Sequence, residues 1–370
     1  MEKEFFTGKI VMLLGPRQVG KTTLVRSLLS GHTDTSIYFD GESLDVQAAL
    51  QPTSLAHLKQ VIGSYRIIAI DEAQKISNIG STLKLLADNL GSDRTFIVTG
   101  SSSLNLLSET SEPLTGRKRV FYLYPFSCAE LMGEADFQTR QQIFTHQLIY
   151  GSYPEVYSAV SYREKRRQIE EITDSYLYRD LLAFNMIRKA NKITDLLKLL
   201  SYQIGSEVAY QEIGNRLNLS KETVENYIDM LEKSFVIFRL PPYRFNARRA
   251  ITGKRKVYFY DLGVRNALIN NFQLLEIRPD RGAMFENFCV AERLKKRAYQ
   301  QIYADQYFYR SYDGAEVDLI EDRDGVLYGY EFKFSERRKT KEPIGWSGER
   351  QSTLTVINTV NFYDWLLQST

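Results

Sequence analysis

Residues 15–22 constrain the fold more than any other part of this 370-residue chain. They read Gly-Pro-Arg-Gln-Val-Gly-Lys-Thr, which fits the phosphate-binding loop pattern of a glycine, four residues and then Gly-Lys-Thr. An apolar run precedes the loop at 10–14, and residues 23–29 are typical of a helix. A strand, a glycine loop and a helix in this order are the context that the pattern requires. We therefore predict an α/β nucleotide-binding core, and an ordinary glycine turn with an exposed lysine is the less favoured alternative.

Each residue type in the loop has a chemical reason. Glycines let the backbone curve so that its N–H groups face phosphate oxygens, and the following helix adds the positive end of its dipole. Lys21 would reach the β- and γ-phosphates, and the Thr22 hydroxyl would ligate Mg²⁺. We therefore expect ATP and Mg²⁺ as ligands. The predicted ATP-binding residues are Gly15, Pro16, Arg17, Gln18, Val19, Gly20, Lys21, Thr22, Thr23 and Ser101.

A second signature of this class of site follows a buried-strand pattern. Residues 67–70 are apolar and end in Asp71 and Glu72. At the carboxyl end of a strand, Asp71 would hold Mg²⁺ directly or through water, and Glu72 would orient or deprotonate the attacking water. A strand that simply ends on surface acids is the alternative, and the preceding phosphate loop argues against it.

Two further segments are candidates for sensing the γ-phosphate. The strand predicted at 95–98 ends in small hydroxyl residues, of which Ser101 would lie beside the nucleotide crevice. Arg117, in the segment 114–119, would stabilise phosphate charge within the chain or across a subunit contact in a homo-oligomer. A Gly/Ser turn and a solvated basic turn are the respective alternatives. The repeated alternation of strands and helices predicts a parallel sheet with helices on both faces.

The composition of the chain argues against several other classes of protein. Hydrophobic residues make up 43% of the chain and charged residues 25%, as in ordinary globular proteins, and the length suggests two or three domains. The net charge of +3 means that any nucleic-acid surface must come from local clustering. Two distant cysteines, Cys128 and Cys289, argue against a disulfide scaffold, and the scarcity of Cys and His argues against zinc. Without a signal-peptide core or a membrane-spanning run, we expect a cytoplasmic protein and no membrane partner.

Residues 207–261 have the pattern of a winged helix-turn-helix. A short helix at 211–217 and a second helix, capped by Ser220 and running to Glu232, precede strands at 235–240 and 257–260. Between the strands, six cations fall in thirteen residues, which is typical of phosphate contacts to DNA. The predicted DNA-binding residues are Arg244, Arg248, Arg249, Lys254 and Arg255. Lys256 is the sixth cation of this basic hairpin. Acidic Glu222 and Glu225 on the second helix favour domain packing or protein contact instead, so both interpretations stay open.

The last third of the chain carries a possible metal-dependent site. A helix at 282–296 bears Glu286, and three strands follow at 306–310, 316–320 and 326–333. Asp318 and the sequence Glu331-Phe332-Lys333 match the PD-(D/E)xK nuclease pattern, because alternation puts Glu331 and Lys333 on one strand face. Asp318 and Glu331 would hold Mg²⁺, and Lys333 would activate the attacking water. A hairpin with solvated acids is the alternative, so whether this site is active stays open.

Together these motifs resemble one large group of bacterial and archaeal AAA-type ATPases with a C-terminal domain of poorly known role. The resemblance is carried by the loop, Ile-Asp-Glu-Ala-Gln-Lys, Thr-Gly-Ser-Ser-Ser, Leu-Thr-Gly-Arg and residues 151–156, Gly-Ser-Tyr-Pro-Glu-Val. It implies an ATPase core, a helical lid, a winged-helix segment and a restriction-endonuclease-like α/β fold.

We therefore predict four segments: an ATPase core at 1–135, a helical lid at 136–204, a winged helix-turn-helix at 205–270 and a nuclease-like domain at 271–370. The function that follows is an Mg²⁺-dependent ATPase whose core controls a DNA-directed C-terminal module. The alternative is a nucleotide-dependent interaction protein whose nuclease fold is inactive.

Overall fold

The structure is a computed structural model, and it describes residues 1–51, 54–101, 114–175, 190–243, 254–311, 316–335, 346–348 and 350–367. Contacts within the chain define two compact units. The first is Met1–Tyr124 with Lys233–Phe235, and the second is Pro125–Glu232 with Val236–Thr370. The four predicted segments remain a prediction, because the contacts distinguish only these two units.

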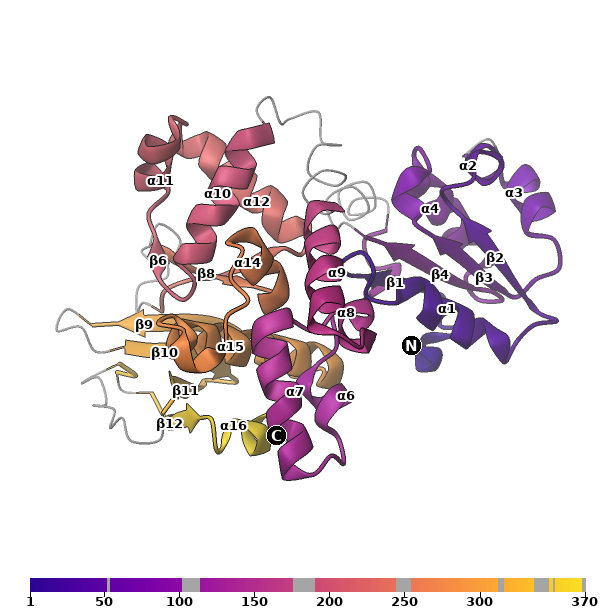
Figure 1. Cartoon of the computed structure of the whole chain (residues 1–370). Coiled ribbons are helices and arrows are strands. Elements are labelled where there is room, and N and C mark those ends of the chain that lie inside the picture. The colour runs from indigo at the N-terminus through magenta and orange to yellow at the C-terminus, as the bar shows by residue number, and fades with distance from the viewer. Residues whose placement is uncertain are drawn as a thin grey trace. The chain divides into compact units, whose positions relative to one another are not determined.

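The first unit is built on a five-stranded sheet in the order β2-β3-β4-β1-β5 (Figure 1). Every neighbouring pair is parallel. This confirms the predicted parallel α/β sheet. The strands are β1 Ile10–Leu14, β2 Ser36–Asp40, β3 Ile67–Asp71, β4 Thr95–Gly100 and β5 Lys118–Tyr122. The three central strands β3, β4 and β1 are buried along their whole length, as expected for parallel strands covered on both faces.

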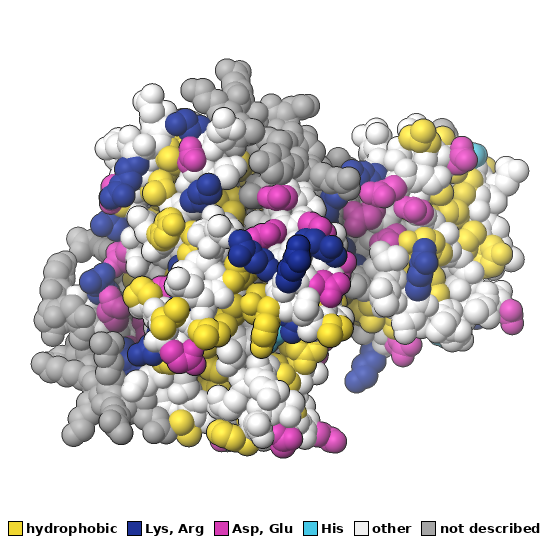
Figure 2. Space-filling view, viewed as in Figure 1, with side chains coloured by type: hydrophobic (Ala, Val, Ile, Leu, Met, Phe, Trp, Pro, Cys, Tyr) yellow, Lys and Arg dark blue, Asp and Glu magenta, His cyan; other side chains and the backbone are white. Residues whose placement is uncertain are grey.

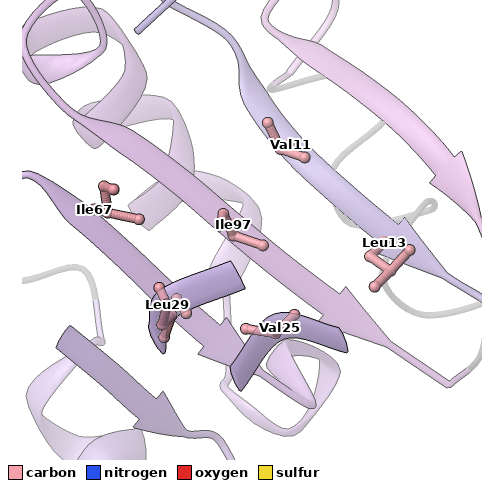
Figure 3. Close-up of a cluster of buried hydrophobic side chains, with 7 residues drawn as sticks. Val11, Leu13, Val25, Leu29, Ile67 and Ile97 are labelled. Carbon is pink, nitrogen blue, oxygen red and sulfur yellow. The ribbon is translucent and has the colours of Figure 1, made fainter. Parts of the chain in front are cut away.

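One helix of this unit fixes the position of the phosphate loop. α1 (Lys21–Ser30) begins where the loop ends, and it places Val25 and Leu29 four residues apart on one face. Figure 3 shows these two side chains beside residues of β1, β3 and β4 in a buried hydrophobic cluster. Because this face is buried against the sheet, the N-terminus of α1 is held at the end of β1. The other helical elements are η1 Glu2–Glu4, α2 Leu44–Ala49, α3 Leu55–Ile62, η2 Ala73–Lys75 and α4 Ile79–Leu90.

The second unit is rich in helices. Its predicted helical segment is confirmed where it is described, although the part predicted at 176–182 lies outside the described residues. The helices are α6 Cys128–Met132, α7 Phe137–Tyr150, α8 Pro154–Ser158, α9 Tyr162–Ser175, α10 Ala190–Tyr202, α11 Tyr210–Leu217, α12 Lys221–Lys233, α14 Leu262–Leu268, η4 Leu275–Ile277, α15 Arg281–Gln300 and α16 Phe362–Leu367. α14 packs against both α7 and α9.

A small antiparallel sheet follows α11 and α12 in the order β6-β8-β7. Its strands are β6 Glu207–Val208, β7 Ile237–Leu240 and β8 Arg255–Phe259. The two helices and two strands predicted for this segment are therefore present. β6 was not predicted, because two residues are too few to give a periodic pattern.

A second sheet of this unit has the order β12-β11-β10-β9. The strands are β9 Asp305–Arg310, β10 Glu316–Arg323, β11 Val326–Lys333 and β12 Ser352–Asn358. β9, β10 and β11 are antiparallel neighbours, as predicted, whereas β12 runs parallel to β11 and was not predicted. α15 packs against β11, so the long helix and the sheet bring their side chains together. No helix in the described part of the chain has the length and apolar character needed to cross a membrane.

Candidate functional site

The phosphate loop has a backbone that only glycine permits at its first position. A Cβ atom on Gly15 would lie 1.9 Å from the carbonyl oxygen of Leu123. Gly20 has φ +96° and forms the left-handed N-cap of α1, and it makes no side-chain capping hydrogen bond. The first N–H groups of a helix lack partners within the helix, so an uncapped N-terminus suits an anion. This geometry fits a phosphate group.

The loop lysine is held against the loop itself. Lys21 is 5% exposed, and its Nζ donates hydrogen bonds to the carbonyl oxygens of Gly15 at 2.9 Å and Pro16 at 2.5 Å. Gln18 is exposed with φ 57°, whereas Val19 is buried. Thr23 is exposed on α1, one residue beyond Thr22. The carbonyl oxygens of Gly15 and Pro16 thus hold the ammonium group of Lys21, and the contacts of the loop residues to ATP remain a prediction.

Three side-chain hydroxyl groups donate hydrogen bonds to the carboxylate of Asp71. Its Oδ2 accepts from the hydroxyls of Thr22 and Tyr38, each at 2.6 Å, and its Oδ1 accepts from the hydroxyl of Thr99. Burial raises the pKa of Asp71, but these three hydrogen bonds and the charge of Lys21 outweigh it and hold that pKa below its ordinary value. The carboxylate therefore stays ionised, as a Mg²⁺ ligand must.

Glu72 lies beside Asp71 in an unusual backbone conformation, with φ 47°. Its Oε2 accepts a hydrogen bond from Ser101 Oγ at 3.0 Å and another from the side-chain amide of Gln74. The amide of Gln74 also donates to Ser101 Oγ at 3.0 Å. The structure thus brings together Glu72 and Ser101, which were predicted from separate motifs.

Sequence reasoning missed two residues of this arrangement, Tyr38 and Gln74. Tyr38 comes from β2, and only the strand order, which pairs β2 with β3, puts it beside Asp71. Gln74 lies two residues after Glu72 in the same motif, so the sequence could have predicted that its side chain contacts Glu72.

The predicted within-chain role of Arg117 is wrong. Parallel pairing sets Lys118 opposite Ile10, at the start of β1, whereas the phosphate loop follows the end of β1. Arg117 therefore lies at the N-terminal end of the parallel strands, away from the phosphate loop. There its guanidinium group pairs with Asp88 of α4. A role across a subunit contact stays a prediction.

The second unit contains the other predicted cluster. β10 and β11 pair Leu319 with Tyr330, so the next step along the same register sets Asp318 opposite Glu331. The backbone N–H of Phe332 donates to Asp318 Oδ2 at 3.0 Å, and Lys333 Nζ donates to Glu331 Oε1.

Lys256 also belongs to this cluster, which corrects its assignment to the basic hairpin. Its Nζ donates to Glu286 Oε1 at 2.9 Å and to Asp318 Oδ1 at 3.1 Å, and lies 3.8 Å from Glu316 Oε2. Two residues further along β8, Tyr258 donates its hydroxyl hydrogen bond to Glu286 at 2.8 Å. The period of two in β8 was a usable signal, but the sequence does not say which face of that strand is buried.

Burial strongly affects the acids of this cluster. Burial and the charge of Asp318 raise the pKa of Glu286 to about 7, against the opposing effect of Lys256. The same two causes raise the pKa of Glu331 to about 7, against Lys333. A cavity of about 700 Å³ opens here, and its lining includes Lys256, Glu286, Asp318 and Lys333.

The cluster does not present a ready set of metal ligands. Among the described residues, no group of three or more His, Cys, Asp or Glu side chains is arranged to hold a metal ion. The carboxylates of Glu286 and Asp318 both contact the ammonium group of Lys256. The assignment of Asp318 and Glu331 as Mg²⁺ ligands stays a prediction.

The predicted DNA-binding cations are only partly described. Arg244, Arg248 and Arg249 lie outside the described residues, Lys254 is exposed, and Arg255 is half-buried at the start of β8. On the face shown in Figure 2, Lys and Arg side chains are interspersed with Asp and Glu. On α9, for example, Arg166 forms an ion pair with Glu170.

Comparison with known families divides the chain into three matched stretches. Residues 7–132 match the family described as AAA domain, and residues 141–275 and 281–356 match two domains of unknown function, DUF8612 and DUF4143. The AAA match covers the phosphate loop, Asp71 and Glu72. Residues 7–132 are therefore similar to an AAA domain, which supports a nucleotide-binding, ATPase-like role for this part of the chain.

Similar proteins occur in distant bacteria. Rv2008c of Mycobacterium tuberculosis is 28% identical over 326 residues, which cover 88% of this chain and 70% of that protein. A protein of Haemophilus influenzae is 23% identical, with 98% of this chain and 95% of that protein covered. The Thermotoga maritima RuvB Holliday junction branch migration motor is 17% identical, with 63% of this chain and 82% of that chain covered, at a TM-score of 0.31.

Proposed function

We propose that this protein binds ATP together with Mg²⁺ and hydrolyses the γ-phosphate. The observation that carries the proposal is the arrangement at the end of β3. Asp71 accepts a hydrogen bond from Thr22, the residue that follows the loop lysine, and Glu72 lies next to it in contact with Ser101. Phosphoryl transfer to water requires a loop that binds the phosphates, two side chains that hold Mg²⁺ and a separate carboxylate that positions the water.

Each side chain has a distinct role in this proposal. The loop N–H groups and Lys21 would bind the β- and γ-phosphates, while Thr22 and Asp71 would hold Mg²⁺. When bound, Mg²⁺ would supply positive charge against the phosphate oxygens. Glu72 would orient the attacking water and accept its proton. The hydrogen bonds from Ser101 and Gln74 would hold that carboxylate in place until the water is positioned.

The test separates binding from turnover. Lys21→Ala should weaken ATP binding by at least tenfold, because it removes the cation at the phosphates. Glu72→Gln should keep ATP affinity within about threefold and reduce turnover by about 10²-fold or more, because a neutral amide cannot accept the proton. Lys84→Ala on α4, which removes an exposed lysine, is the matched control. Unchanged hydrolysis in both site variants would contradict the proposal.

A second candidate function is that the ATPase core controls a DNA-directed, nuclease-like C-terminal module. It is favoured by the clustering of Glu286, Asp318, Glu331 and Lys333 from α15, β10 and β11. Its competitor is a nucleotide-dependent interaction protein with an inactive module. Cleavage of plasmid and single-stranded DNA with Mg²⁺ or Mn²⁺, with and without ATP, distinguishes the two.

If the module is active, Lys333→Ala should abolish cleavage and leave ATP hydrolysis near normal. If the unaltered protein cleaves neither DNA under any of these conditions, the inactive alternative holds. The winged-helix proposal has its own test: changing Arg248, Arg249, Lys254 and Arg255 together to Ala should weaken DNA binding and flatten its salt dependence. Unchanged affinity at low salt would assign this segment to packing.

A further inference from the structure

Lys256 occupies the centre of the carboxylate cluster in the second unit. Its side chain is 3% exposed, and its ammonium group lies 2.9 Å from Glu286 and 3.1 Å from Asp318. These two acids come from different elements, α15 and β10. An ammonium group has three donors and a compact charge, so it satisfies carboxylates that converge from several directions.

The other acids of the cluster have their own cations. Glu331 pairs with Lys333, and Glu316 pairs with Arg310 at 3.0 Å. Within the described chain, the ion pairs of Glu286 and Asp318 run to Lys256. Two buried or nearly buried carboxylates therefore depend on one lysine for charge compensation. A buried carboxylate that loses its cation destabilises the fold strongly.

One oxygen in the cluster is unused. Glu331 is 8% exposed, and its Oε2 is buried without a hydrogen-bond partner among the described residues. Glu331 lies on β11, the strand beside β10, which carries Asp318. A buried carboxylate oxygen without a donor is a group that a cation would satisfy.

We propose that the Lys256 ammonium takes the position of a divalent cation between Glu286 and Asp318, on the sheet that also carries Glu331, and that it closes a latent metal site. A divalent ion needs several oxygens at about 2.0–2.6 Å, and an ammonium that already contacts two of these acids excludes it. The site is therefore held without metal by the chain's own cation, and it becomes a metal site when that cation is removed. This inference does not depend on ATP hydrolysis.

The experiment measures Mn²⁺ binding without nucleotide, by calorimetry and by the thermal shift that Mn²⁺ causes. Lys256→Gln removes the charge but keeps a donor for the two carboxylates. We expect it to bind one Mn²⁺ at least tenfold more tightly than the unaltered protein, and to gain thermal stability from Mn²⁺. Adding Asp318→Asn should abolish this binding. Lys198→Gln, which removes an exposed lysine on α10, should behave like the unaltered protein.

A second variant covers the case in which Lys256→Gln does not fold. Lys256→Met with Glu286→Gln removes one charge of each sign and leaves Asp318 and Glu331, so it should also gain Mn²⁺ binding. The proposal is overturned if the unaltered protein already binds Mn²⁺ as tightly through Asp318. It is equally overturned if both Lys256 variants fold and neither gains a site.

Discussion

Tyr38 donates a hydrogen bond to Oδ2 of Asp71 at 2.6 Å, from the strand beside the one that carries the carboxylate. The same oxygen accepts from Thr22, so Asp71 links the loop helix α1 to two strands of the sheet. Burial and this hydrogen bond raise the pKa of the Tyr38 hydroxyl, which therefore stays protonated and acts as a donor. Tyr38 is thus a positioning residue for Asp71.

Tyr38→Phe removes this donor and leaves the ring. We expect the free energy of unfolding to fall by about 1.5–3 kcal/mol, because a hydrogen bond to a charged group contributes about that much. ATP hydrolysis should require a higher Mg²⁺ concentration, since Asp71 is held less firmly. Urea unfolding and a Mg²⁺ titration of the ATPase rate measure the two effects, with Tyr65→Phe as the control. Unchanged values in both would show that Tyr38 does not position Asp71.

Local patterns predicted the parts of this protein that depend on neighbouring residues. The strand at 326–333 has the predicted bounds, and the phosphate loop begins α1 as expected, because alternation and glycine spacing are local properties. The within-chain role of Arg117 could not be judged from the sequence because the end of the sheet at which it lies depends on strand direction and order. Lys256 was placed in the basic hairpin because its partners lie 30 and 62 residues away, and the period of two in β8 does not say which face of that strand is buried.

Gly15→Ala tests the close approach in the phosphate loop. The added Cβ would overlap the carbonyl oxygen of Leu123, which is backbone and cannot swing aside, so the loop must shift. We expect a loss of stability of about 1–3 kcal/mol and a large loss of ATP binding. Gly31→Ala is the control, because its Cβ would have no neighbour within 4 Å. Thermal unfolding and nucleotide titration check this. If Gly15→Ala binds ATP normally, the described loop geometry is not the one that binds nucleotide.

The buried pair of Arg293 and Glu321 should contribute strongly to the second unit. Two hydrogen bonds, at 3.0 and 2.9 Å, join side chains that are both 0% exposed. Arg293→Met leaves a buried carboxylate with less compensation, so we expect a loss of about 3–5 kcal/mol. Arg216→Met breaks an exposed pair with Glu212 and should cost less than about 1 kcal/mol. Equal effects of the two changes in urea unfolding would contradict the burial of the first pair.

His146 on α7 gives the stability of this protein a defined pH dependence. Its ring lies between those of Tyr150 and Tyr157, with centroids 5.6 and 5.4 Å away. Burial, and then the charge of Lys165, lower its pKa to about 4. Between about pH 6.5 and 4 the unfolded chain therefore binds a proton that the folded chain does not, so the free energy of unfolding falls as the pH falls through this window. The loss is at most about 3.5 kcal/mol, since one pKa unit corresponds to about 1.4 kcal/mol.

His146→Gln isolates this contribution, because the amide does not titrate. Other groups titrate in the same window, so the quantity to measure is the difference in the free energy of unfolding between the two proteins at each pH. That difference should be constant above about pH 7, where the imidazole is neutral in both folded and unfolded chains. Below pH 6.5 it should change in favour of the variant, until the folded imidazole also takes up its proton near pH 4. A difference that stays constant from pH 8 to 4 would mean that His146 titrates alike in both states, and that its ring is not held in a buried position.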